Sequence, residues 1–203
     1  MDAAIGMALA RLCAHAVRMI AFGVLANSCF AQEGKSVDIK REVLTVVLRD
    51  FHARKLEPLP LEPGILLVHR HSSVLKSGNL RSFMRPPSQQ TCKLPSELQS
   101  KLIQVNSQTT DAEALVVPTK NWRLIDKSDE DGDIGEKWHL GPKRGERVKT
   151  ILSVWRPAIS ADANLAFVYF SFLWSIHGAD AHYLLERKGK GWRVNCTEFF
   201  FYP

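Results

Sequence analysis

Glu198 is the residue of this 203-residue chain whose place in the sequence pattern points most directly to chemistry. In the strand register derived below, Glu198 falls on the apolar face of a predicted sheet, across from Ala181. An apolar hollow would raise the pKa of this carboxyl group, which could then act as a general base or bind a polar ligand group. His182 and Tyr183 are its candidate partners. The alternative is a β-bulge within residues 197–201, favoured by three consecutive phenylalanines, which would turn Glu198 to solvent.

A second pair of candidates, His69 and His71, lies two positions apart around a strand predicted from Ile65 to Arg70. Alternation along a strand places both side chains on one face, a spacing that two metal ligands can use. The motif contains no cysteine, aspartate or glutamate to complete a ligand set. We therefore expect neither a metal site nor a cofactor, and interpret both histidines as polar positions on a half-exposed strand.

Three runs rich in aromatic and β-branched residues end the chain and predict a β-meander, three antiparallel strands in sequence order. The runs span residues 165–176, 179–188 and 192–202. Short turns are expected between them, at His177-Gly178 and at Gly189-Lys190, where glycine can supply the positive φ of a two-residue loop.

Turn geometry then predicts which residues face each other. Phe172 lies opposite Tyr183, and Tyr183 lies opposite Cys196, on one apolar face. Glu186 lies opposite Arg193 on the other face. A slip of one residue would expose the aromatic side chains, at roughly 1.5–3 kcal/mol each.

Two amphipathic helices are expected to cover this sheet. The first spans Ser36 to Arg54, where apolar residues recur at helical spacing after a serine that can act as N-cap. The second is short, with Pro95 in its first turn and its end near Asn106. Early helices and late antiparallel strands predict an α+β fold, with the helices packed on a curved antiparallel sheet that ends in the meander. Further short strands are expected at Ala114–Val117, Trp122–Ile125 and Ile151–Arg156.

Residues 1–31 have the pattern of a signal peptide, so a single folded domain is expected over residues 32–203. Two arginines precede the apolar run from Met19 to Leu25, and small residues suit cleavage after Ala31. The run is shorter than the roughly 20 residues of a spanning helix. We therefore expect a periplasmic or secreted protein with no membrane span after signal removal. A retained anchor and a lipid attached at Cys29 are the alternatives.

Two cysteines, Cys92 and Cys196, remain after the signal is removed. An even pair in an oxidising compartment permits one disulfide across a long loop. The predicted register, however, points Cys196 into the core, where a free thiol packs as a small hydrophobe. We favour two separate cysteines because Cys92 follows a Pro-rich segment that we expect to be an exposed loop, and we keep the disulfide as the alternative.

The chain is mildly basic, with 27 lysines and arginines, 21 aspartates and glutamates, and a formal net charge of +6. The basic residues are scattered except at residues 143–147 and 187–190. Neither run is interleaved with aromatic residues as a nucleic-acid surface would be. We therefore expect solvated turns at these runs and no nucleic-acid partner.

The segments Leu165–Ser171, Ala181–Arg187 and Gly191–Val194, with Leu94–Leu98 and Trp122–Ile125, resemble parts of a family of uncharacterised exported bacterial proteins. This resemblance implies a fold and no activity. A helix over a curved antiparallel sheet is also similar, at the level of the fold alone, to the cone-shaped fold of nuclear transport factor and ketosteroid isomerase relatives.

The sequence favours a non-catalytic binding or interaction module of the bacterial envelope, with an unknown protein or small-molecule ligand as its partner. The reason is that the chain contains no nucleophile elbow and no Gly-rich phosphate loop, while a large sheet face is predicted. The alternative is a small-pocket enzyme or ligand carrier that uses Glu198.

Overall fold

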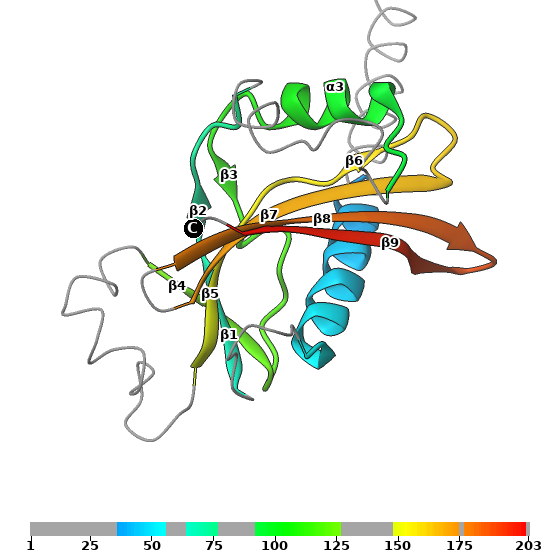
Figure 1. Ribbon diagram of the computed structural model, residues 1–203. Helices are drawn as coiled ribbons and strands as arrows, with labels where there is room; N and C mark the ends of the chain where they lie inside the picture. The colour runs from blue at the N-terminus through cyan, green and yellow to red at the C-terminus, as the bar shows by residue number, and fades with distance from the viewer. Residues whose placement is uncertain (1–35, 56–63, 77–91, 127–147, 175–176, 202–203) are drawn as a thin grey trace, which may run out of the picture. The chain divides into compact units, whose positions relative to one another are not determined.

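The largest element is a seven-stranded sheet in which most neighbouring strands are antiparallel (Figure 1). Strand β1 runs parallel to both β4 and β5, whereas β5, β7, β8 and β9 pair antiparallel. The α+β class is confirmed, and the two parallel pairs are an addition to the predicted antiparallel sheet. The strands lie in the order β4 (Trp122–Ile125), β1 (Ile65–His69), β5 (Val148–Val154), β7 (Leu165–Trp174), β8 (His177–Lys188) and β9 (Gly191–Phe201), with β6 (Ala158–Ile159) also paired with β7.

This computed structural model describes residues 36–55, 64–76, 92–126, 148–174 and 177–201. The predicted signal peptide lies outside these residues, as do the basic run at residues 143–147 and residues 202–203. The chain divides into two units, Met1–Ile39 and Lys40–Pro203, and the sheet belongs to the second. Neither described helix has the length and apolarity that crossing a membrane requires.

The C-terminal meander is confirmed, but its first turn is not at His177-Gly178. Trp174 pairs with His177, so both turn residues expected there belong to β8, and Phe172 faces Ala179 instead of Tyr183. Gly178 does not mark a turn, because glycine is tolerated at a strand end, where the longer pairing uses its backbone groups. The shift is four residues, an even number, so the side chains of β7 and β8 keep the faces that the sequence predicted. The second predicted turn, at Gly189-Lys190, is confirmed, and Gly189 has the expected positive φ of 63°.

The helix predicted from Ser36 to Arg54 is confirmed and spans residues 36–53. Near its end, Phe51 packs edge-on against Phe170 and Phe172 of β7, with both ring centroids at 5.0 Å. We call this side of the sheet the helix face; Tyr183 of β8 lies on it, beside Phe170. The fully buried side chains of the helix form one apolar stripe: Val43, Leu44, Val47, Leu48 and Phe51.

A buried lysine fixes the end of this helix. Lys149 of β5 is only 6% exposed, and its Nζ donates hydrogen bonds to the carbonyl oxygens of Phe51, His52 and Arg54 at 3.1, 2.7 and 2.8 Å. The last carbonyls of a helix have no partner within the helix and carry partial negative charge, so a cation stabilises them. Burial lowers the pKa of Lys149, and the three acceptors compensate for the water that its ammonium group has lost.

The second helix, α3 (Ser96–Val105), covers the other side of the meander, which we call the α3 face (Figure 1). Pro95 precedes the helix as its N-cap instead of lying within the first turn. At the other end, buried Asn106 donates to the carbonyl oxygens of Leu102 and Arg156, both at 2.9 Å, and accepts from Thr110. Its amide thereby joins α3 to the connection between β5 and β6. The buried cluster under α3 comprises Leu75, Leu98, Leu102, Trp155, Ala158, Phe167, Tyr169 and Leu184.

Of the shorter predicted strands, the one at Trp122–Ile125 is confirmed as β4. The one predicted at Ile151–Arg156 exists as β5, but it begins earlier, at Val148, and ends at Val154. The strand predicted at Ala114–Val117 is wrong. Its two buried residues, Leu115 and Val116, lie in a turn whose amides both donate to the carbonyl oxygen of Ala112. A small two-stranded sheet precedes it instead, formed by β2 (His71–Ser72) and β3 (Thr110–Asp111).

The aromatic packing on the helix face predicts that alanine substitutions at two neighbouring residues of β7 change the free energy of unfolding by very different amounts. Phe172→Ala is expected to lower the free energy of unfolding by about 3–5 kcal/mol, because it removes a ring that is 1% exposed. The next residue, Leu173, is 44% exposed, so Leu173→Ala should change it by less than about 0.5 kcal/mol. Urea unfolding of both variants measures the difference, and equal effects would contradict the packing.

Candidate functional site

A β-bulge in β9 determines which side chains can meet. The pairs Glu186 with Arg193 and Leu185 with Val194 form as predicted, but the register then shifts by one residue. Asn195 is the extra residue, and it is exposed. Beyond it, side chains of β9 lie on the face opposite to the one that a regular strand would give.

The bulge moves Glu198 from its predicted place. Glu198 pairs with His182, not with Ala181, and lies on the α3 face. The alternative of a bulge within residues 197–201 is also wrong in position, since the shift occurs before them. Glu198 is half-buried, neither inside the helix-face core nor fully in solvent.

The ring of His182 is enclosed by aromatic side chains. It is 3% exposed and lies against Phe167, Tyr169 and Phe200, with ring centroids at 5.4, 5.4 and 4.6 Å. Burial in this apolar setting lowers the pKa of His182 to about 4, so the imidazole is neutral near pH 7. Its Nε2 atom is buried and has no hydrogen-bond partner within the described part of the chain.

A cavity of about 10 Å³ connects His182 with Glu198. A single water needs about 10–15 Å³ of such volume and two or more polar partners. An imidazole nitrogen and a carboxylate are suitable partners, so the site can hold one water. It has no room for an organic substrate in this conformation. The lining residues are Cys92, Leu94, Phe167, His182, Leu184, Glu198 and Phe200.

Tyr183, the third candidate, is separated from the other two by the sheet. Its ring lies on the helix face between Phe170 and Phe199, with ring centroids at 5.6 and 6.2 Å. Burial, and then the negative charge of Asp50, raise the pKa of Tyr183 above its ordinary value. Asp50 itself forms an ion pair with Arg54, whose guanidinium carbon lies 5.9 Å from the centre of the tyrosine ring. Tyr183 is therefore a protonated core residue and cannot assist Glu198.

The two candidate metal ligands belong to different strands and different sheets. His69 ends β1, whereas His71 begins β2 and pairs with Asp111 of β3. The strand that was predicted to carry both histidines is interrupted at Arg70. Within the described ranges, no three histidine, cysteine, aspartate or glutamate side chains are placed to hold a metal ion.

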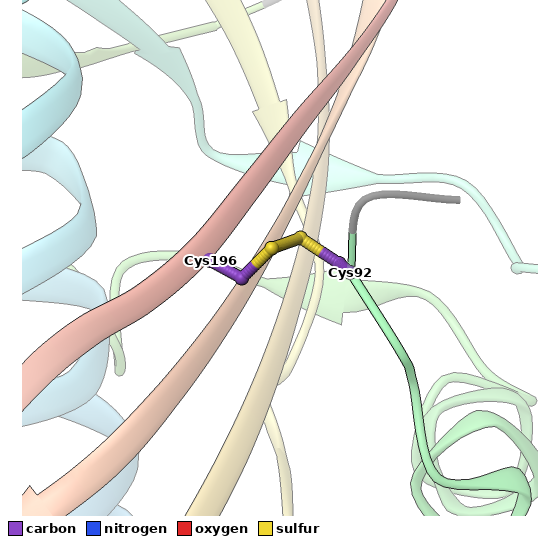
Figure 2. Close-up of a disulfide and its surroundings, with 2 residues drawn as sticks. All are labelled: Cys92 and Cys196. Carbon is purple, nitrogen blue, oxygen red and sulfur yellow. A yellow bond between two sulfur atoms is a disulfide. The ribbon is translucent and has the colours of Figure 1, made fainter. Parts of the chain in front are cut away.

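Cys92 and Cys196 form a disulfide, with Cα atoms 5.6 Å apart (Figure 2). The expectation of two separate cysteines is wrong, and the bulge explains why. It turns Cys196 away from Tyr183 and sets it opposite Leu184, on the α3 face where Cys92 leads into α3. The bond thus attaches the segment that leads into α3 to β9, and Cys92 is one of the residues that line the cavity.

The sequence does contain a signal for this bulge. On the helix face, Trp192 and Val194 have even numbers whereas Phe199 and Phe201 have odd numbers. A strict period of two cannot place all four on one face unless one residue is added between them. The change of parity, more than the run of phenylalanines, indicates the position of the extra residue.

Comparison with known proteins adds no relative to these observations. No protein-family model matches the chain, and neither a curated protein nor a solved structure is significantly similar to it. Function is therefore inferred from this chain's own residues.

Loss of the disulfide is expected to destabilise the protein. The bond closes a separation of 104 residues, so replacing both cysteines with alanine should lower the free energy of unfolding by about 2–5 kcal/mol. Urea unfolding with and without dithiothreitol tests this, since reductant should weaken the native protein and leave the double variant unchanged. A native protein that unfolds at the same urea concentration after full reduction would contradict the expectation.

Burial of His182 predicts a pH dependence of stability. Its pKa is about 4 in the folded protein, against 6.5 for an ordinary histidine. The stability that comes from the neutral ring is fully present above pH 6.5 and is lost as the pH falls toward 4, because the unfolded chain takes up the proton first. The loss should be about 3 kcal/mol across this window.

Urea unfolding above and below the window measures this loss. His182→Gln should flatten the dependence, whereas His71→Gln, which changes an exposed histidine, should leave it unchanged. The interpretation of His182 would be wrong if its variant kept the native pH dependence.

Proposed function

We propose that this protein is an exported, non-catalytic interaction module that binds an extended polypeptide along the outer edge of β9. The observation that carries this proposal is the edge itself. Strand β9 has 11 residues and is the last strand of the sheet, with no described strand on its outer side. The outer edge of a terminal strand is a template on which one more strand can pair.

The covering of both sheet faces supports the edge as the binding surface. The helix of residues 36–53 packs on one face and α3 on the other, where they bury the large apolar side chains of β7 and β8. The large sheet face that we expected from the sequence as a binding surface is therefore mostly covered by the protein's own helices. The outer edge of β9 borders no described strand, and its Phe201 side chain is exposed.

The two edge strands of the sheet differ in length and in side chains, and only β9 suits the addition of a further strand. The opposite edge strand, β4, has only four residues, and short edge strands protect a protein from unwanted pairing. Strand β9 instead ends in three phenylalanines, of which Phe199 and Phe200 are half-buried and Phe201 is 44% exposed. In strand addition the backbone supplies affinity and alternate side chains supply specificity.

Export is supported by two separate features of the chain. The N-terminal pattern of residues 1–31 is that of a signal peptide, with cleavage expected after Ala31. The disulfide between Cys92 and Cys196 suits an oxidising compartment such as the periplasm or the cell exterior. We place the module there.

A small-pocket activity is the second candidate, because His182 and Glu198 line the same cavity and the buried Nε2 atom of His182 has no described hydrogen-bond partner. The size of this cavity favours the interaction module over a small-pocket activity, since about 10 Å³ admits one water and no substrate. Glu198→Gln should therefore leave the binding of a small-molecule library, measured by thermal shift, unchanged. A ligand that stabilises the native protein and not this variant would favour the pocket instead.

Strand addition predicts that Phe201 contributes to partner binding. A panel of labelled ten-residue peptides with alternating apolar and polar residues serves as the probe, and fluorescence polarisation measures Kd. Phe201→Glu should weaken binding at least about tenfold, because it removes an aromatic side chain from the buried contact. Leu173→Glu is the matched control, since Leu173 is also 44% exposed. Equal weakening by both variants, or no binding by any peptide together with a monomeric protein, would contradict the proposal.

A further inference from the structure

The β9 edge has a shape and a charge pattern that select its occupant. We infer that the occupant is a second copy of this chain, with the two β9 strands antiparallel about a two-fold axis between Asn195 and Cys196. The inference rests on the proposed strand addition at β9 and names the partner. Three features of the edge carry it: its bulge, its charges and its aromatic residues.

The bulge at Asn195 favours a partner with the same bulge. Against the regular strand β8, β9 has one residue too many, and Asn195 is left over. A regular foreign strand on the outer edge would meet the same mismatch. A second copy brings its own extra residue to the same place, so residues 193–198 of the two strands match one to one.

The charges on the α3 face are complementary in this register. Arg193 and Glu198 both lie on that face, because the bulge between them reverses the alternation. The two-fold axis sets Arg193 of each copy opposite Glu198 of the other, so the ion pair forms twice. A slip of one residue would set Arg193 against Thr197 or Phe199, whose side chains lie on the helix face. Opposite charges in cross-strand pairs stabilise a sheet, and like charges destabilise it.

The aromatic residues of the helix face meet in the same register. Trp192 of each copy lies opposite Phe199 of the other, and aromatic cross-strand pairs are among the favourable ones. Phe201 lies opposite Lys190, an exposed turn residue whose aliphatic stem can cover a ring. The exposed end of β9 is thus covered by the start of β9 in the second copy.

Charge reversal tests the inference, with sedimentation velocity of the purified protein over a concentration series as the measurement. The native protein should form a dimer. Arg193→Glu and Glu198→Arg should each raise the dimer Kd at least about tenfold, because each makes two repulsive pairs per dimer. The double variant restores both attractive pairs and should return Kd to within about threefold of the native value.

Glu97→Arg is the matched control: it makes the same charge change at an exposed position of α3 and should leave the dimer intact. The rescue by the double variant separates a lost contact from a misfolded chain. The register would be overturned if neither single charge reversal changed the dimer Kd, or if the double variant stayed monomeric. A native monomer that still binds the peptide panel through Phe201 would overturn the second copy while supporting strand addition. A native monomer that binds no peptide would refute both.

Discussion

The position of Phe51 on the sheet is the contact on which the rest of the structure depends. Its ring fills the space between Phe170 and Phe172, and the backbone that carries it is held by the hydrogen bonds from Lys149. One hydrophobic contact and one electrostatic contact thus fix the same helical turn from two directions. Because interiors are closely packed, a helix held in this way allows few arrangements of the meander beneath it.

The second constraint is the single extra residue in β9. Without Asn195, Cys196 would point toward the helix and could not reach Cys92. Glu198 would lie among the helix-face aromatics instead of beside His182. The disulfide, the water-sized cavity and the charge pattern of the edge therefore have one common origin in the backbone. Bulges often reorient side chains near functional surfaces, and this one acts on several side chains at once.

Local patterns predicted those parts of the fold that local physics controls. Helical periodicity predicted the ends of both helices to within about one residue. Alternation identified the apolar face of β7 and β8, although the predicted pairing of these strands was wrong by four residues, because an even shift leaves each side chain on its face. The site was harder, because the partner of Glu198 depends on a one-residue irregularity that changes the face of every later side chain. The parallel neighbours of β1 and the buried contacts of Lys149 join residues far apart in the sequence. No local spacing encodes such pairs.

Strand β9 follows β8 in the chain and covers its outer side in the sheet. Until β9 is added, Cys92 lacks its disulfide partner Cys196, and β8 is the edge of the sheet. Strand β8 is a long run of 12 residues, buried along most of its length in the finished protein. An edge of this kind pairs readily with other chains. A polypeptide cut short before Gly191 would therefore lack more than β9: it would present an aggregation-prone edge of β8, which β9 covers in this structure.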